Sequence, residues 1–156
     1  MATNNLLQRL PMKDDVTFTD VAESNRRQVE TFISNNAIAA GNWVQFDNSK
    51  TGPNQVIYVG DAGTAANGNG LVVGVALHAT TAADQRLEVC VGGYCASAAV
   101  ATGVTAETVI AMRTGTAGLA IAAANTDLAN ACGVVLTTIP VAPGNLGEVF
   151  VYKNKF

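Results

Sequence analysis

The chain has 156 residues, 49% of them apolar, with no uninterrupted run of the roughly 20 apolar residues that a membrane-spanning helix needs, so one globular domain and no membrane partner are expected. The net charge of −3, with only nine Lys and Arg residues, argues against a nucleic-acid partner, which would require clustered basic side chains. Residues 1–36 hold nine charges and the other 120 residues only 12, a lower density than the roughly 25–35% charged surface typical of soluble monomers. We therefore expect an assembly to cover part of the surface.

Residues 1–36 are expected to form an N-terminal arm and a short helix outside the main domain. The arm, residues 1–15, has apolar residues without a period, and Pro11 would end any helix there. Asp20 or Ser24 could cap a helix that runs to about Ile33. The side chains expected to contact a partner are Leu6, Leu7, Leu10 and Val16.

From residue 37 the pattern changes to short apolar, β-branched runs separated by turn residues, which is typical of strands. The predicted strands cover residues 43–46, 55–59, 71–77, 86–91, 109–113, 119–122, 133–139 and 147–152. The Ala-rich residues 117–131 favour a helix by propensity, but their glycines and the repeat described next favour a short strand and a loop. We predict the strand.

Two similar units of about 60 residues are indicated by a repeat. Residues 37–46 align with residues 103–112 at an offset of 66, and Gly74 aligns with Gly133 at an offset of 59. The first copy thus has about seven extra residues, which we place near residues 50–54. Because half a sheet cannot bury its own apolar face, the repeat predicts one mainly β, compact barrel or sandwich over residues 37–156, built from two similar halves. Chance similarity among strands rich in Ala, Gly and Val is the alternative.

Two cysteines flank a Gly-Gly pair. If Gly92 and Gly93 form a two-residue hairpin turn, Cys90 lies opposite Cys95 as a possible cross-strand pair, within the reach of a disulfide. Leu87, Val89 and Val91 would then face the core, with Cys90 pointing outward. Reduced thiols are favoured over a disulfide or a metal site, because the cytosol is reducing and Cys90, Cys95, Cys132 and the lone His78 show no ligand spacing.

No catalytic constellation is apparent, so we expect a protein that is not an enzyme and that needs no cofactor or metal. His78 is the only histidine and ends a predicted strand, which favours a surface role over that of a catalytic base. Glu88 and Glu148 occupy equivalent positions of the repeat, where outward-facing charges discourage edge pairing between sheets.

Five short runs carry a resemblance to a known family. They are AIAAGNWV from Ala37, GLVVGVAL from Gly70, LEVCVGG from Leu87, GVVL from Gly133 and GEVFV from Gly147. In this order they resemble the small β-rich capsid decoration, or cement, proteins of tailed bacteriophages. The resemblance implies a homo-oligomer, a trimer or a dimer, that binds the major capsid protein on the outer surface of the head and clamps neighbouring subunits. It implies a virion location, assembly in the host cytoplasm and no catalytic residues.

Two other classes fit the same composition. A tail-tube or other phage structural subunit would be equally rich in strands and poor in charge. A carbohydrate-binding β module would expose aromatic side chains, for which the chain offers Trp43, Tyr58, Tyr94, Phe150 and Tyr152, although the strand of Trp43 is predicted to be buried.

Overall fold

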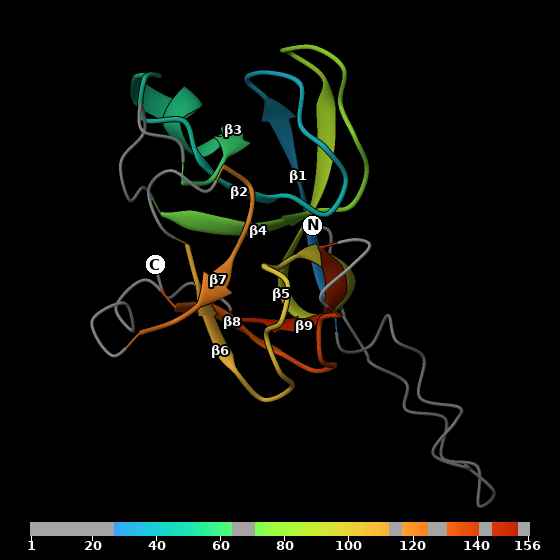
Figure 1. Cartoon of the computed structure of the whole chain (residues 1–156). Coiled ribbons are helices and arrows are strands. Elements are labelled where there is room, and N and C mark those ends of the chain that lie inside the picture. Colours follow the sequence, from blue (N-terminus) through green and yellow to red (C-terminus); the bar gives the residue numbers. More distant parts are fainter. Residues whose placement is uncertain (1–26, 64–70, 113–116, 125–130, 141–144, 153–156) are drawn as a thin grey trace, which may run out of the picture.

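The computed structural model describes residues 27–63, 71–112, 117–124, 131–140 and 145–152, and these are mainly strands (Figure 1). The arm residues Leu6, Leu7, Leu10 and Val16, and the first part of the expected helix, lie outside the described residues. The elements are β1 (Arg27–Ser34), β2 (Trp43–Phe46), the 3-10 helix η3 (Gly52–Val56), β3 (Tyr58–Asp61), β4 (Val72–Ala76), β5 (Arg86–Ala99), β6 (Val109–Ala111), β7 (Ile121–Ala122), β8 (Ala131–Val135) and β9 (Leu146–Val151). None of the helical residues within these ranges forms a segment long and apolar enough to cross a membrane.

The first five strands close into a barrel. The order β1-β3-β2-β4-β5 returns to β1 through an antiparallel pairing in which Arg27 is opposite Gly93 and Ile33 is opposite Arg86. Within this ring only the contact between β1 and β3 is parallel. In Figure 1 this barrel is the upper part of the molecule. Closure leaves no free edge along the ring, which removes sites for pairing with other chains.

A second ring continues from the same long strand. The C-terminal half of β5 pairs with β9, and the order continues through β8 and β6 to β7. A parallel bridge between Val100 and Ala120 returns the ring to the end of β5, with hydrogen bonds from Ala120 N to Ala99 O and from Ala101 N to Ala120 O. This second barrel is the lower part of Figure 1, and β5 is common to both barrels.

The strand registers confirm the predicted duplication. In the first copy Val44 pairs with Gly74, and in the second copy Ile110 pairs with Gly133. Val44 and Ile110 are 66 residues apart and Gly74 and Gly133 are 59 apart, which are the two offsets found in the sequence. Each pairing is followed by a bulge at the same place, after Val44 and after Ile110. Val44 also pairs with Asp61 in β3, and Ile110 pairs with Ala122 in β7, so β3 and β7 are equivalent. The offset between the copies is 61 residues at this strand. Most of the extra residues therefore lie between β2 and β3, in the segment that contains η3, as predicted.

The prediction of a helix up to Ile33 is wrong for residues 27–34, which form β1. Phe32 and Ser34 are buried while the residues between and before them are more exposed, which is a strand pattern rather than a helical one. The sheet therefore begins before residue 37. The C-terminal half of β5 takes the place of β1 in the second barrel. Phe32 of β1 pairs with Leu87, and at the equivalent place in the second barrel Ala98 of β5 pairs with Gly147 of β9. Each repeat thus starts ten residues earlier than the sequence comparison indicated.

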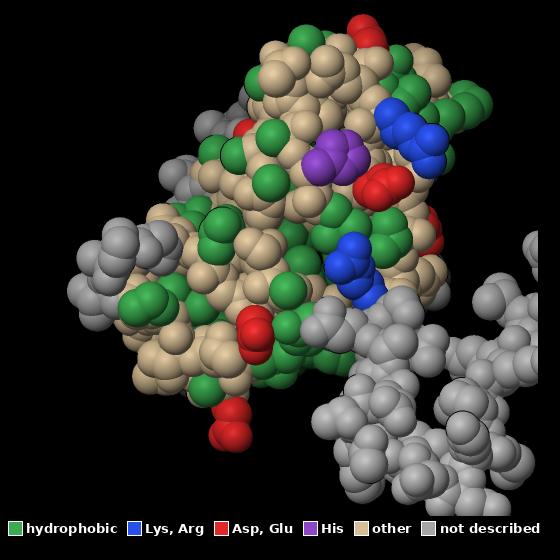
Figure 2. All heavy atoms as spheres, turned by 90° about the vertical axis from the view of Figure 1, so that its right-hand side faces the viewer, with side chains coloured by type: hydrophobic (Ala, Val, Ile, Leu, Met, Phe, Trp, Pro, Cys, Tyr) green, Lys and Arg blue, Asp and Glu red, His purple; other side chains and the backbone are tan. Residues whose placement is uncertain are grey.

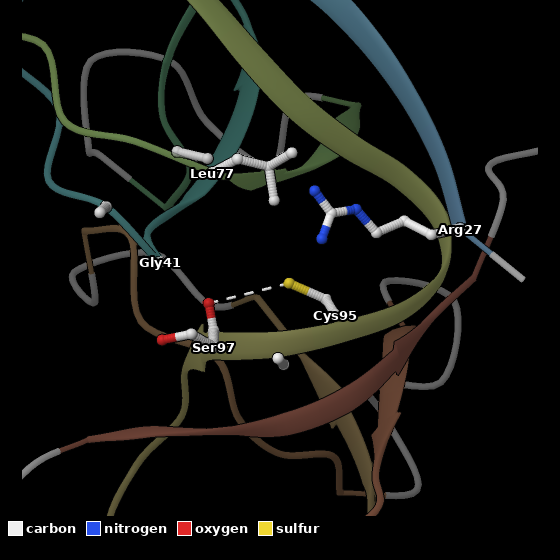
Figure 3. A pocket seen from close by; sticks show the side chains of 8 residues that line it. Arg27, Gly41, Leu77, Cys95 and Ser97 are labelled. Atoms are coloured by element: carbon white, nitrogen blue, oxygen red, sulfur yellow. Dashed lines mark hydrogen bonds between the residues drawn. The ribbon is translucent and has the colours of Figure 1, made fainter. Parts of the chain in front are cut away.

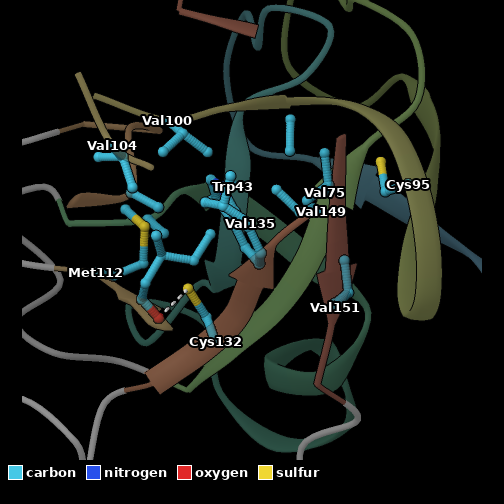
Figure 4. Packing of buried hydrophobic residues seen from close by; sticks show 14 of the residues in the cluster. Trp43, Val75, Cys95, Val100, Val104, Met112, Cys132, Val135, Val149 and Val151 are labelled. Atoms are coloured by element: carbon cyan, nitrogen blue, oxygen red, sulfur yellow. Dashed lines mark hydrogen bonds between the residues drawn. The ribbon is translucent and has the colours of Figure 1, made fainter. Parts of the chain in front are cut away.

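The predicted hairpin at Gly92 and Gly93 is also wrong, because both glycines lie inside the continuous strand β5. Gly93 has a φ of +84° and pairs with Arg27 on one side and with Val151 on the other. The strand bends here as it passes from the first barrel to the second, and Figure 4 shows this curve beside Cys95. Leu87, Val89 and Val91 are buried, as predicted for that part of the strand.

Smaller differences concern strand ends. Residues 55 and 56 belong to η3 rather than to a strand, because Pro53 stands at the start of this helical turn, and β3 begins at Tyr58. In the Ala-rich region the short strand β7 (Ile121–Ala122) is present, as predicted. The predicted strands at 43–46 and 147–152 agree with β2 and β9 to within one residue.

Each barrel has its own apolar interior. The first is filled by Phe32, Ile38, Val44, Val59, Val73, Ala76, Leu87, Val89 and Val91. The second contains Val104, Ile110, Met112, Cys132, Val135, Ile139, Val149 and Val151, together with Trp43, Ala62, Val75 and Cys90 from the first barrel (Figure 4). Trp43 is fully buried, its indole Nε1 donates to Ala99 O at 3.0 Å, and its backbone N–H donates to Gly118 O at 3.0 Å. It therefore joins the two barrels.

Candidate functional site

The bend of β5 brings Cys90 and Cys95 together. Five residues of extended strand span about 16 Å, far beyond the reach of two thiols. In the bent strand the thiol of Cys90 donates to Tyr94 O, the carbonyl that precedes Cys95, at 3.7 Å, and the two thiols are near enough for each to shift the pKa of the other. Both cysteines are free thiols. The two side chains thus meet as a pair, although the hairpin expected to bring them together is absent.

Cys90 is also more buried than expected. It points out of the first barrel, but the second barrel covers that face, so its exposed fraction is 0%. The hydrogen bond with Cys95 and the burial of its sulfur raise the pKa of Cys90. The neighbouring Cys90 thiol lowers the pKa of Cys95, burial opposes this change, and the positive charge of Arg27 adds to the lowering.

A cavity of about 180 Å³ opens beside this pair. Figure 3 shows the side chains of Arg27, Leu77 and Cys95 directed toward the same space, with the Cys95 thiol donating to Ser97 O at 3.7 Å. Its full lining consists of Arg27, Ala40, Gly41, Ala76, Leu77, Cys95, Ala96 and Ser97. The sequence prediction missed Arg27 because it assigned this residue to a helix outside the domain.

The third cysteine has a different environment. The thiol of Cys132 donates to Ile110 O at 3.5 Å inside the second barrel, and burial raises its pKa to about 12. His78 is exposed, and its Nε2 lies 3.1 Å from Arg86 O. In the parts of the chain that the structure describes, no three His, Cys, Asp or Glu side chains come close enough to hold a metal ion.

A second feature is an apolar row on the outer face of the second barrel, formed by Tyr94, Val134, Leu136 and Phe150. Phe150 pairs directly with Tyr94 on one side and with Val134 on the other, so the three side chains share a face. Phe150 is 43% exposed and Leu136, two residues after Val134, is 42% exposed. The alternation of Val134 with Leu136 is visible in the sequence, but the sequence did not show that Phe150 and Tyr94 lie beside them.

Charges are sparse around the outer row. Residues 93–152 contain only Glu107, Arg113, Asp127 and Glu148, whereas residues 27–92 contain eight charged residues. Figure 2 shows the side of the molecule that faces right in Figure 1, where uncharged groups make up most of the visible surface. The carbohydrate-binding alternative loses its main aromatic residue, because Trp43 is fully buried as predicted.

Comparisons with known proteins extend these observations. No family model matches the sequence, and no curated protein sequence matches it either. The fold is similar to the N base of head fiber gp8.5 of bacteriophage phi29, with a TM-score of 0.57, 13% identity, and coverage of 83% of this chain and 98% of that one. It is also similar to a chain of the capsid of Myoviridae phage XM1, with a TM-score of 0.55, 20% identity, and coverage of 100% and 99%. The likeness is one of fold.

Proposed function

We propose that this chain is a structural protein of a tailed-phage virion that decorates the outside of the head. It binds the major capsid protein as a homo-oligomer, most simply a trimer, and stabilises the contacts between neighbouring capsid subunits. The observation that carries the proposal is the fold, which is similar over 83% of this chain to a head fiber base and over 100% of it to a component of a phage capsid.

The surface of the second barrel supports this proposal. Its outer row exposes Leu136 and Phe150 in a region that is poor in charge, and contiguous exposed apolar side chains are characteristic of surfaces that another protein covers. Aromatic residues are also enriched in such interfaces. We therefore assign the outer row to the contact with the capsid or with another copy of the chain.

The N-terminal arm supplies a second contact. Burying Leu6, Leu7, Leu10 and Val16 would contribute about 1.5–3 kcal/mol for each side chain. Fixing the backbone of 15 residues costs about 1–2 kcal/mol per residue, so the arm alone cannot hold the protein on the head. Contacts of the barrels must add to it, and several arms of one oligomer engaging together would raise the overall affinity.

Binding to heads that lack the protein tests the proposal. The double substitution Leu136→Ser with Phe150→Ser should weaken binding by about tenfold or more, because it removes more than about 1.4 kcal/mol of apolar contact. Deletion of residues 1–15 should also weaken binding, because it abolishes the joint engagement of several arms of one oligomer. Leu71→Ser is the matched control, since Leu71 is 60% exposed but does not belong to the outer row. Co-sedimentation with heads measures binding, and light scattering of the free protein measures its oligomeric state.

Undiminished binding by both altered proteins would contradict the assigned surfaces. Electron cryo-microscopy of the source particles separates the proposed location from the alternative. Density for the double barrel on the outside of the head agrees with a decoration protein, whereas density in the tail would assign the chain to a tail-tube or another tail structure and overturn the proposal.

A further inference from the structure

We propose that Cys95 and Cys90 form a reversible redox site, in which Cys95 is oxidised by a small peroxide and Cys90 then closes a disulfide across the bend of β5. The site is independent of the proposed role in the virion. It rests on three observations: the approach of the Cys90 thiol to the backbone next to Cys95, the cavity that reaches Cys95, and the position of Arg27.

The contact between the thiols comes from the bend. Gly93, with its φ of +84°, turns the strand so that the sulfur of Cys90 lies 3.7 Å from the carbonyl oxygen of Tyr94, next to Cys95. A disulfide requires the two sulfur atoms to approach to about 2 Å, and the Cys90 thiol already lies against the carbonyl group of Tyr94, the residue bonded to Cys95. Cys90 is therefore placed to act as the resolving thiol of Cys95.

The cavity determines which thiol reacts first. Only 1% of Cys95 is exposed to bulk solvent, but its side chain borders the cavity of about 180 Å³, which has room for several molecules of the size of water or hydrogen peroxide. Cys90 does not line this cavity, and its exposed fraction is 0%. A small oxidant therefore reaches Cys95 before Cys90.

Arg27 gives the cavity a positive charge beside the thiol. The neighbouring Cys90 thiol is the larger cause of the lowered pKa of Cys95, and the guanidinium group of Arg27 adds to it, so both favour the thiolate form. The thiolate is the form that attacks a peroxide. Among the described residues, no other basic side chain lines the cavity.

The reaction balances with hydrogen peroxide as the oxidant. The Cys95 thiolate attacks one oxygen, the O–O bond breaks, and Cys95 becomes a sulfenic acid while hydroxide leaves. The sulfur of Cys90 then attacks the sulfur of Cys95, the S–O bond breaks, and the departing hydroxide takes the proton of Cys90 as water. Two thiols are oxidised to a disulfide, one peroxide is reduced to two waters, and a small dithiol reductant reverses the step.

Peptide mapping of the full-length protein after treatment with hydrogen peroxide tests this inference. The expected product is a bond between Cys90 and Cys95, with the loss of two hydrogen atoms and recovery on reduction. Cys132 is the internal control, because it is enclosed in the second barrel; it should react at least about tenfold more slowly than Cys95.

Variants separate the roles of the two thiols. In C90S a sulfenic acid should persist on Cys95 and be captured by a dione reagent, whereas C95S should show neither the sulfenic acid nor the disulfide. R27Q should slow the reaction of Cys95 by about twofold or more, and R27K, which keeps the charge, should restore most of the rate. Urea-unfolded protein, in which all three thiols are accessible, should lose the preference for Cys95.

The inference is overturned if folded wild-type protein treated with peroxide leaves Cys95 unmodified, oxidises Cys132 as fast as Cys95, or links Cys95 to Cys132 or to another chain. These results are read on the wild-type protein, so they remain decisive even if a variant fails to fold. Formation of the sulfenic acid on Cys90 in C95S would also contradict the assigned order of reaction.

Discussion

The two barrels have the same order of strands and the same registers, but their interiors differ at equivalent positions. Phe32 and Leu87 face each other in the first barrel, and their counterparts in the second are Ala98 and Gly147. The aromatic Phe46, which packs edge-on against Phe32, corresponds to Met112. At these positions the side chains of the second barrel are smaller than those that fill the interior of the first barrel.

Two side chains from elsewhere fill that volume. Ile139 corresponds to Thr80 of the first barrel, and its Cδ1 occupies the space that a side chain at residue 147 would need. Trp43, which corresponds to Val109, inserts from the first barrel and lies 3.3 Å from where a Cβ of Gly133 would be. The comparison teaches that one copy of the duplicated unit forms a self-contained core, while the other depends on its neighbour. We infer that the second barrel does not fold alone.

Substitution of Trp43 should produce the largest effect. Trp43→Ala removes a large side chain that links the two barrels and one of the two donors to Ala99 O, so it should lower the free energy of unfolding by about 3–5 kcal/mol. Val109→Ala at the equivalent position, which is only half-buried, should cost about 1 kcal/mol. Urea denaturation measures both. Equal losses would show that Trp43 is not the special connection between the barrels.

Leu87 and Gly147 occupy equivalent positions in the two barrels, and substitution by Ala should destabilise the protein at both, for opposite reasons. Leu87→Ala should cost about 2–4 kcal/mol because it creates a cavity, and Gly147→Ala should cost about 1–3 kcal/mol because its methyl group would overlap Ile139. Ile139→Val removes the overlapping atom and should therefore rescue Gly147→Ala. A double-mutant cycle by thermal unfolding checks the coupling. Additive losses would mean that Ile139 does not occupy the place of the missing side chain.

The smallest effect concerns a pair of residues with a positive φ. Gly41 at +85° and Glu107 at +66° are equivalent, since each donates its N–H to the last residue of the corresponding strand, Ala76 or Val135. Glu107→Gly should stabilise the protein by about 0.5 kcal/mol by relieving backbone strain. Gly41→Ala should destabilise it by about 1–2 kcal/mol, and Leu146 Cδ2, 2.6 Å from the new Cβ, adds to the cost. Thermal denaturation of the two single variants compares the sites; destabilisation by Glu107→Gly would contradict the equivalence.

The sequence by itself determined much of the fold. The runs around Gly74 and Gly133 showed the duplication, and the offsets of 66 and 59 between the copies are the offsets of the strand registers. The alternation of Leu87, Val89 and Val91 with polar residues gave the buried face of the first part of β5. These features were readable because strand periodicity and the glycines at close backbone contacts are local properties of the chain.

Tertiary structure alone decided the start of each repeat. Val29, Phe32 and Ile33 have a helical spacing, but residues 27–34 form a strand because the long edge of β5 offers them backbone hydrogen bonds, which outweigh the local preference. The counterpart of this strand, the C-terminal half of β5, shares almost no side chains with it. The sequence comparison could not connect two strands that are equivalent only through their partners.

The junction of the barrels was decided in the same way. Gly92 and Gly93 read locally as a hairpin turn, but Gly93 has partners on both sides, Arg27 and Val151, so the strand bends and continues instead of reversing. The bend is what joins Cys90 to Cys95, opens the cavity beside Arg27, and buries a cysteine that points out of the first barrel. A residue pattern specifies which conformations a glycine can adopt, whereas the strands that pack on either side determine which one it takes.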